Sequence, residues 1–255
     1  MKIATWNVNS VRARLPRLEA WLGHERPDLL CMQESKVTDE LFPRETLEAL
    51  GYRLDVFGQK TYNGVALAAR KPVSDIVRGL PDDSPDAERR LISATLEGIR
   101  IVNVYVPNGT ALGTPRFTFK LEWFARLREM LAATASPDDP LLLCGDFNVA
   151  PEDRDVHDPE KWRGRLLFHP AEHAALRPLF EWGLIDAFRA LHPEARQFTW
   201  WDYRAGAFHR GWGLRIDLML MTPSLAARCR EVRIDREARK GEKPSDHAPV
   251  IAEID

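Results

Sequence analysis

Short apolar runs recur along the whole chain and are separated by turn residues. Runs of this length, several of them alternating between apolar and polar positions, predict β-strands. The Glu97-Gly98 pair between two runs is typical of a tight hairpin turn. The predicted strands are Lys2–Trp6, Leu29–Gln33, Gly64–Ala69, Leu91–Leu96, Ile99–Val106, Leu141–Cys144, Phe198–Trp201, Ile216–Met221, Glu231–Asp235 and Pro249–Ile254.

Longer stretches carry apolar residues at helical spacing. One helix is predicted to follow Ser10, which can cap it, and Pro16 fits this helix only if it lies in the first turn. Two more helices are predicted over Phe117–Leu131 and Ala171–Trp182. Hairpins mixed with long helices indicate an α/β protein with mainly antiparallel sheets between helix layers. No repeat or linker divides the chain, so we expect one domain over residues 1–255.

Composition and charge narrow the classes of function. The 36 Lys and Arg residues against 38 Asp and Glu give a formal net charge of −2, so any nucleic acid must bind to a local patch. No apolar run approaches the roughly eighteen residues of a membrane span, and the N-terminus turns polar too soon for a secretory signal. An odd number of cysteines (3) without a CxxC pair favours a reducing compartment. We therefore expect a cytoplasmic protein without a membrane segment.

Several predicted strands end on a polar residue that packing alone does not require. These residues are Asn7, Glu34, Tyr105, Asp146 with Asn148, and Asp217, and the loop before the final strand adds Asp246 and His247. Taken singly, Asp146 fits a turn, Asn7 a helix cap, and Asp217 a solvent-facing strand position. Together they indicate a functional site held at the rim of a rigid sheet.

The residue types suggest a metal site beside a water-activating pair. Glu34, Asp246 and the amide oxygen of Asn7 are hard oxygen ligands, suited to Mg²⁺ or Mn²⁺ rather than zinc. Asp146 and Asn148 stand two residues apart, so both can point the same way from extended backbone. One can orient and deprotonate a water molecule while the other holds that water or an anionic oxygen.

The remaining candidates can stabilise negative charge. Asp217 can fix the tautomer of His247 and raise its pKa, and a protonated histidine beside a metal stabilises a pentacovalent phosphorus. Tyr105 adds a phenol that can donate to the same phosphate. An acid, a base, oxyanion donors and a divalent ion together describe hydrolysis of a phosphodiester by water, without a covalent intermediate.

Ordered motifs covering nearly the whole chain resemble exonuclease III and the abasic-site endonucleases of the endonuclease/exonuclease/phosphatase superfamily. The resemblance implies a four-layer α/β sandwich, with two mostly antiparallel β-sheets packed face to face and flanked by helices. It also implies Mg²⁺-dependent cleavage of duplex DNA 5′ to abasic sites, removal of 3′-blocking groups, and 3′→5′ exonuclease action. The matching segments are Ile3–Asn9, Cys31–Lys36, Tyr62–Leu67, Asn103–Gly109, Gly145–Val149, Gly183–Arg189, Phe198–Arg204, Leu214–Asp217 and Ser245–Val250.

The resemblance also implies a role for each matching residue. Metal binding falls to Glu34, its neighbour Asn7 and Asp246, and catalysis to Tyr105, Asp146, Asn148, Asp217 and His247. An apolar pocket for the flipped-out abasic sugar is implied at Trp200, Leu214 and Ile216, which otherwise read as core residues. DNA contacts are implied at Tyr62, Arg90 and Asn108. Exposed arginines at Arg12, Arg14 and Arg17 either extend a phosphate-facing patch or are simply solvated.

Two alternatives stay open at this point. The same metal site serves other phosphoesters in phosphoinositide phosphatases, sphingomyelinases and deoxyribonuclease I relatives, but the Tyr105–Gly109 and Phe198–Arg204 segments favour the abasic-DNA branch. The second alternative is a catalytically dead DNA-binding protein. The intact Glu34, Asp146 and His247 count against it, because binding alone does not need them. We expect a nucleoid-associated monomer that acts on double-stranded DNA with abasic or 3′-blocked ends.

Overall fold

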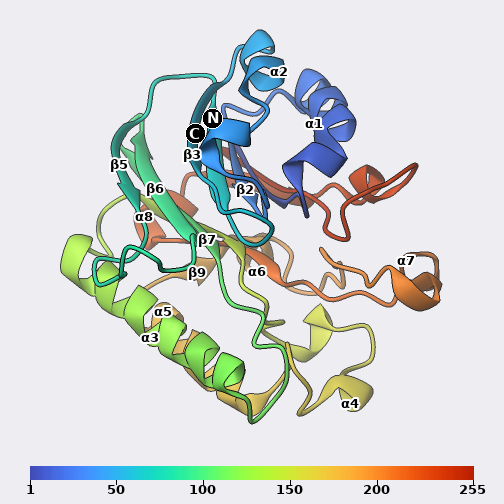
Figure 1. Cartoon of the computed structure of the whole chain (residues 1–255). Helices are drawn as coiled ribbons and strands as arrows, with labels where there is room; N and C mark the ends of the chain where they lie inside the picture. Colours follow the sequence, from blue (N-terminus) through green and yellow to red (C-terminus); the bar gives the residue numbers. More distant parts are fainter.

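Two β-sheets face each other and helices cover their outer sides (Figure 1). The computed structural model describes residues 1–255. Helices α1 and α2 lie over the first sheet, and α3 and α5 lie over the second (Figure 1). The helices are α1 (Val11–Glu25), α2 (Arg44–Ala49), α3 (Pro115–Thr134), α4 (Pro159–Trp162), α5 (Pro170–Glu181), α6 (Ala187–Leu191), α7 (Ala207–Arg210) and α8 (Pro223–Ala226), with 3₁₀ turns at Asp39–Leu41, Asp153–Asp155, Arg204–Gly206 and Arg236–Arg239.

The first sheet joins the two ends of the chain. Its strands are β1 (Lys2–Asn7), β2 (Leu29–Gln33), β3 (Arg53–Phe57), β4 (Val65–Ala69), β11 (Cys229–Ile234) and β12 (Val250–Ile254). The spatial order is β11-β12-β1-β2-β4-β3, so the first and last strands are neighbours. Only the β1/β2 pair is parallel, and the other neighbouring strands are antiparallel.

The second sheet has the same number of strands and a similar plan. Its strands are β5 (Ser74–Arg78), β6 (Leu91–Leu96), β7 (Ile99–Tyr105), β8 (Leu141–Asp146), β9 (Ile185–Asp186) and β10 (Asp217–Met221). The order is β5-β6-β7-β8-β10-β9, and only the β7/β8 pair is parallel. The predicted hairpin turn at Glu97-Gly98 is confirmed, with both residues at positive φ, 48° and 81°.

Apolar side chains fill three layers of core. Residues such as Cys31, Ile101 and Met219 pack between the two sheets. Trp6 and Leu18 belong to the layer between the first sheet and α1. A third layer lies between the second sheet and the α3/α5 pair. Because helix, sheet, sheet and helix follow one another, the expected four-layer α/β sandwich is confirmed. No helix has both the length and the apolar character needed to cross a membrane.

Three local predictions need correction. Phe198–Trp201 is not a strand, because only Trp200 forms isolated bridges, to Leu214 and to His247. Pro16 is the sixth residue of α1 and not part of its first turn. The helix tolerates it because the preceding turn faces solvent, where water can hydrate the carbonyl that loses its partner. The edge strands β3 and β5 were not predicted, since few of their side chains are buried.

A buried polar seam connects the sheets below the rim that carries the candidate residues. The Gln33 side-chain NH₂ donates to Asn103 Oδ1 at 2.7 Å and to Thr5 Oγ1 at 2.8 Å. Asn103 in turn donates to the main-chain oxygen of Met32 at 3.0 Å. All four residues are fully buried. Leaving these groups unbonded in the core would be costly, so their bonds favour one placement of the two sheets against each other, although the Gln33 Oε1 atom has no partner.

Candidate active site

Side chains from both sheets converge at one rim. The Asn7 NH₂ group, at the end of β1, donates to Glu34 Oε1 and Asp146 Oδ2, each at 2.9 Å. His247 Nε2 lies 3.7 Å from Asp146 Oδ2, and His247 Nδ1 lies 2.8 Å from Asp217 Oδ2. Residues from five separate stretches of the chain therefore form one continuous polar cluster.

Strand register explains this convergence. In the antiparallel pair β8/β10, Asp217 stands directly opposite Asp146. In the parallel pair β7/β8, Tyr105 stands opposite Asp146 from the other side. Neighbouring strands place paired residues about 5 Å apart, so Asp146 is flanked on both sides by functional groups. The prediction that strand ends would gather these residues is confirmed.

Two of the candidates have unusual backbone conformations. Glu34 has φ of 53° and Asn148 has φ of 50°, both in the left-handed region that non-glycine residues seldom adopt. The Asn148 main-chain NH donates to Asp146 Oδ1 at 2.8 Å, and its side-chain NH₂ donates to the Val106 carbonyl at 3.0 Å. Backbone strain of this kind concentrates at functional sites, where the surroundings hold it in place.

His247 is held in its protonated form. Burial alone would lower its pKa, but the carboxylates of Asp217 and Asp146 and the hydrogen bond to Asp217 raise the pKa of His247 to about 10. The Ser245 hydroxyl fixes the loop below it by donating to the Asn7 carbonyl at 2.7 Å, and it accepts from the His247 main-chain NH. At neutral pH the site therefore contains a fixed positive charge.

The pKa values of Asp146 and Tyr105 are both raised above their ordinary values. Burial is the largest cause that raises the pKa of Asp146 to about 7, with Asp217 and Glu34 adding to it, and with His247 and the Asn7 hydrogen bond opposing it. Burial also raises the pKa of the Tyr105 phenol well above its usual value, and Glu34 adds to this effect. Asp146 is thus a stronger proton acceptor than an ordinary aspartate, while Tyr105 keeps its proton.

A group of ligand atoms suited to a metal ion is present. Atoms of Glu34, Asp146 and His247 all lie within 4.8 Å of one another. Asp217 Oδ1 is buried and has no hydrogen-bond partner. Lys36 Nζ lies 2.7 Å from Glu34 Oε2, so a cation already offsets part of the acidic charge. Two hard carboxylates with unbalanced charge fit a divalent cation.

Two of the predicted metal ligands are arranged differently from the prediction. Asn7 turns its NH₂ group, not its oxygen, toward the carboxylates, and its Oδ1 accepts from the Asn9 main-chain NH at 3.0 Å. Asp246 lies outside the three-residue group. Its oxygens accept from the Asn9 NH₂ at 2.8 Å and from the Trp200 indole NH at 3.0 Å. Only Glu34 of the predicted ligands belongs to the group.

The expected apolar pocket is exposed only in part. Leu214 is 0% and Ile216 is 1% exposed, and both pack with Val156 and Phe168 in a small core cluster. Trp200 packs against this cluster and keeps part of its surface exposed. The structure therefore brings the three residues together, but places Leu214 and Ile216 beneath the surface that Trp200 offers.

The residues predicted to touch DNA separate into two groups. Tyr62 is 68% exposed. Asn108 is also exposed, and its NH₂ group donates to Asn148 Oδ1 at 2.9 Å. Arg90, in contrast, is buried: it bonds to Glu88 at 2.7 Å and to the Tyr105 carbonyl at 3.1 Å, and its guanidinium stacks on the Tyr105 ring. Arg90 therefore supports Tyr105 from a largely buried position, and its contact with DNA stays a prediction.

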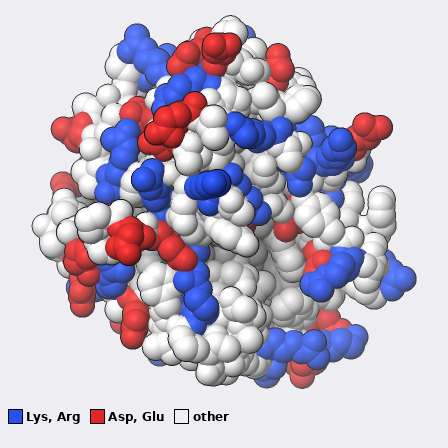
Figure 2. Space-filling view, viewed as in Figure 1, with Lys and Arg blue, Asp and Glu red and all other residues white.

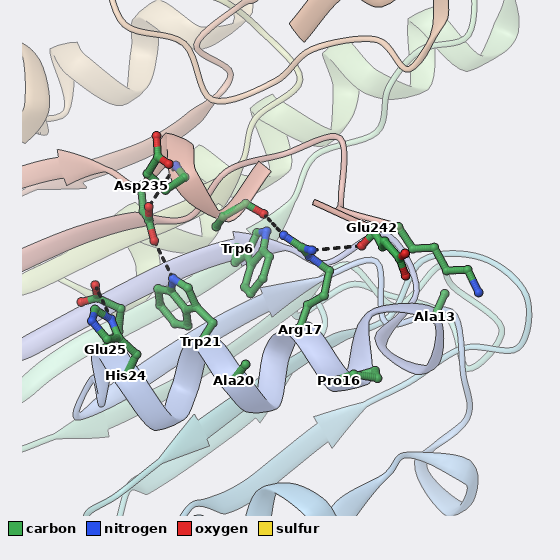
Figure 3. A pocket seen from close by; sticks show the side chains of 13 residues that line it. Trp6, Ala13, Pro16, Arg17, Ala20, Trp21, His24, Glu25, Asp235 and Glu242 are labelled. Carbon is green, nitrogen blue, oxygen red and sulfur yellow. Dashed lines mark hydrogen bonds and ion pairs between the residues drawn. The ribbon is translucent and has the colours of Figure 1, made fainter. Parts of the chain in front are cut away.

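The helix arginines also make internal contacts rather than a free phosphate patch. Arg17 donates to the carbonyls of Ala238, Lys240 and Glu242, which ties the segment before His247 to α1 (Figure 3). Arg12 and Arg14 donate to the Leu41 carbonyl and the Tyr203 hydroxyl. Other basic side chains remain on the surface: Figure 2 shows Lys and Arg on the rims of a hollow in the face of the molecule that it presents.

A large surface hollow lies away from this site. A hollow of about 740 Å³ separates α1 from residues 235–243, and Trp21, Asp235 and Glu242 are among the residues that line it (Figure 3). It contains none of the converged carboxylates. Trp6 is its one link to the site, because this indole lines the cavity and donates to the His247 carbonyl at 3.1 Å.

Sequence patterns missed several residues that shape the site. Asn9 and Lys36 lie within the segments that match the family, but the sequence did not predict their contacts. Asn9 bonds to Asp246, and Lys36 pairs with Glu34. Lys120 and Glu172 form a fully buried ion pair behind Asn148. A signal for Lys120 existed, since it falls on the helix face of Phe117, Phe124 and Leu127, where a charged residue is unexpected.

Comparisons with known proteins agree with this geometry. Residues 4–247 match the profile of the endonuclease/exonuclease/phosphatase family. The chain is 40% identical to exodeoxyribonuclease III of Haemophilus influenzae, over 100% of both chains. It superimposes with a TM-score of 0.96 on a 3′ phosphatase from Neisseria bound to product DNA hairpin (44% identity, 100% and 99% coverage). It superimposes equally well, at 0.96, on an AP endonuclease from Archaeoglobus fulgidus (42% identity, 100% and 99% coverage). This chain belongs to the endonuclease/exonuclease/phosphatase family.

Proposed function

We propose that this protein is a metal-dependent DNA repair nuclease. It hydrolyses the phosphodiester 5′ to abasic sites, removes 3′-blocking groups, and degrades duplex DNA from the 3′ end. The observation that carries the proposal is the buried series Asp217, His247 and Asp146, which places a protonated imidazole beside a proton-accepting carboxylate. Relatives named exodeoxyribonuclease III, 3′ phosphatase and AP endonuclease support it.

One bond change accounts for all three activities. A water oxygen attacks the phosphorus while the P–O3′ bond breaks, and the 3′ oxygen leaves and takes up a proton. Asp146 accepts the proton of the attacking water, since its raised pKa of about 7 makes it a suitable base near neutral pH. The products are a free 3′-hydroxyl and a phosphate, which is either inorganic or at the 5′ end of the released nucleotide or strand.

Other side chains stabilise the developing charge. Protonated His247 donates from Nε2 to a non-bridging phosphate oxygen, while Asp217 holds the ring through Nδ1. The Tyr105 phenol donates to the same phosphate, and Arg90 keeps its ring in place. Asn148 steadies the water and the phosphate from the opposite side of Asp146. Each of these donors is in position before substrate binds, which lowers the cost of reorganisation.

The proposed cofactor is Mg²⁺, with Mn²⁺ as a substitute. Glu34 would hold it, with Asn7 fixing the Glu34 and Asp146 carboxylates and Asp246 placed nearby through Asn9, which leaves Asp146 free to accept a proton. When bound, the ion neutralises phosphate charge and acts as a Lewis acid. Its charge also relieves the repulsion between the buried carboxylates Glu34, Asp146 and Asp217.

Substrate selection rests on a few exposed groups around this rim. Trp200 forms the apolar surface against the baseless sugar, with Leu214 and Ile216 supporting it from below, and a normal nucleotide is rejected because its base does not fit. Tyr62 and Asn108 contact the DNA backbone. Residues 1–255 form one domain, which the core that both sheets share supports. The protein acts as a monomer.

The decisive experiment uses three DNA duplexes. One carries a single abasic-site analogue, one a 3′-phosphate, and one a normal recessed 3′ end, each incubated with Mg²⁺ or with EDTA. We expect a nick 5′ to the abasic site, loss of the 3′-phosphate and shortening of the third duplex, all abolished by EDTA. Asp146→Asn lowers each rate by about 10²-fold or more. Exposed Asp86→Asn serves as the matched control. Metal-independent cleavage, or a normal rate for Asp146→Asn, contradicts the proposal.

A further inference from the structure

A lysine is fully buried directly behind the active site. Lys120, on α3, is 0% exposed, and so is its ion-pair partner Glu172 on α5. The two helices lie against each other on the outer face of the second sheet (Figure 1). The layer that they share with this sheet contains a large cluster of buried apolar side chains. An ion pair here needs an explanation, because burying two charges costs more than packing apolar side chains of similar volume.

The Lys120 ammonium points at two loops of the site. Its Nζ donates to the Asn148 main-chain oxygen at 2.7 Å and to the Asn108 main-chain oxygen at 3.1 Å, and Glu172 accepts the remaining bond. The two asparagines are themselves joined, because the Asn108 NH₂ donates to Asn148 Oδ1. These loops follow β7 and β8, so one ammonium group ties together the ends of the only parallel strand pair in the second sheet.

Glu172 is fixed in its turn. Its second carboxylate oxygen accepts from the His169 main-chain NH at 3.0 Å and so closes the first turn of α5. Burial lowers the pKa of Lys120, and Glu172 counteracts this effect by pairing with the charged form. The carboxylate therefore keeps the ammonium charged, and the charged form supplies the three donors that the two carbonyls and Glu172 require.

We propose that Lys120, held by Glu172, is a positioning residue that fixes the left-handed backbone of Asn148 and the adjacent Asn108 for catalysis. This inference rests on the proposed function of Asn148. Asn148 has φ of 50°, a left-handed conformation that asparagine adopts more readily than most residues, and the bond from Lys120 to its carbonyl fixes the loop in this one geometry. Without the bond to its carbonyl, the loop relaxes and the Asn148 side chain moves relative to Asp146. Misplacement of a reacting group by about 1 Å can cost on the order of 10²-fold in rate.

The test removes both charges together. Lys120→Met alone leaves Glu172 as an unpaired buried charge and can prevent folding, so the informative protein is Lys120→Met/Glu172→Leu, in which apolar side chains of similar size replace the pair. The control is Leu176→Ala, a cavity variant on the same helix that makes no bond to the site. Melting temperatures, the single-turnover rate on the abasic duplex with saturating protein and Mg²⁺, and the Kd for uncleaved duplex in Ca²⁺ are measured for all three proteins.

We expect the double variant to lose some stability, because the Asn108 and Asn148 carbonyls and the His169 NH lose their partners, but to lose no more than Leu176→Ala. It should nevertheless cleave about 10-fold or more slowly, with a much smaller change in Kd. Leu176→Ala loses stability and keeps its cleavage rate. A double variant that cleaves at the wild-type rate overturns the inference. So does a Leu176→Ala control that loses as much cleavage rate, for a given loss of stability, as the double variant does.

A double-mutant cycle tests whether Lys120 and Glu172 affect the cleavage rate through Asn148. In an Asn148→Ala background, removing Lys120 and Glu172 should cost little further rate, because the group that they position is already absent. Additive losses overturn the inference and leave the role of Asn148 intact. A normal rate for Asn148→Ala itself overturns both that role and the inference that depends on it.

Discussion

His247 Nδ1 and Asp217 Oδ2 lie 2.8 Å apart, with both side chains buried. The opposite ring nitrogen faces Asp146 at 3.7 Å, so one imidazole links two carboxylates from neighbouring strands. Because Asp217 holds the ring and makes the largest contribution to its charged state, the chemistry of His247 depends on a residue behind it. This dependence can be measured through pH.

Replacing Asp217 with Asn should shift the pH dependence of cleavage. The wild-type pKa of about 10 keeps His247 protonated through the neutral range, and losing the carboxylate lowers that pKa. The alkaline limb of the pH–rate profile should therefore move to lower pH by about 1–3 units. Single-turnover rates measured from neutral to alkaline pH test this. An unmoved limb with a uniformly lower rate means that Asp217 acts only on ring orientation.

The same pair predicts how stability depends on pH. The pKa of His247 in the folded protein lies above its ordinary value of 6.5, so the pair stabilises the fold fully below about pH 6.5 and this contribution is lost as the pH rises through about 10. The free energies of unfolding in urea of wild type and Asp217→Asn should differ most at about pH 6 and converge toward pH 10. A difference that grows with pH contradicts the assignment.

Divalent ions should stabilise the folded protein itself. The ion binds the native carboxylates but finds no preformed site in the unfolded chain, so at about 100 times Kd it adds about 2.7 kcal/mol to the free energy of unfolding. Thermal melting in Mg²⁺ should rise by about 5 °C or more over melting in EDTA. The rise should vanish in Glu34→Gln and persist in Glu97→Gln, whose carboxylate lies in the distant hairpin turn. Equal shifts in both variants would place the ion elsewhere.

Substitutions of Arg90 and Tyr62 should have different effects, although both residues match DNA-contacting positions: the first should lower stability, and the second should lower DNA binding. Arg90→Leu removes charged hydrogen bonds to Glu88 and to the Tyr105 carbonyl, which costs about 2 kcal/mol of stability. Tyr62→Ala removes an exposed side chain and leaves stability unchanged. Chemical denaturation together with DNA-binding anisotropy separates the two. If Tyr62→Ala binds DNA normally, Tyr62 does not contact the duplex.

Trp200 should control discrimination between abasic and intact DNA. Trp200→Ala removes a partly exposed aromatic ring that packs on this apolar cluster and should reduce the preference for the abasic duplex by about 10-fold to 100-fold. Trp200→Phe keeps an apolar ring but loses the bond to Asp246, so it should retain most of the preference. Competition between abasic and intact duplexes gives the ratio directly. Equal preferences in all three proteins exclude Trp200 from recognition.

The sequence predicted where the site would form better than it predicted the bonds within it. Polar residues at strand ends stand out because packing does not call for them, and register then forces Asp146, Asp217 and Tyr105 together. The direction of a side-chain amide carries no such signal. Asn7 was predicted to offer its oxygen, but two acidic neighbours draw its NH₂ group instead.

The local sequence pattern also did not predict which charged side chains would be buried or which strand-like segments would find pairing partners. Arg90 was predicted to touch DNA, yet it is buried, because Glu88 pairs with it from two residues away and the Tyr105 ring and carbonyl contact its guanidinium. Lys120 is buried because Glu172, which is distant in the chain, neutralises it. Phe198–Trp201 has the composition of a strand, but only Trp200 finds pairing partners, one on each side. Such outcomes depend on contacts formed after the elements assemble, which no short window of sequence contains.

The adjacency of β1 and β12 also links the site to long-range strand pairing. β1 ends at Asn7, and β12, the strand after His247, pairs with it from Lys2 opposite Glu253 to Thr5 opposite Val250. The imidazole therefore reaches its carboxylate partners only when the first and last strands of this sheet have joined. Formation of the site thus reports that the first sheet has closed.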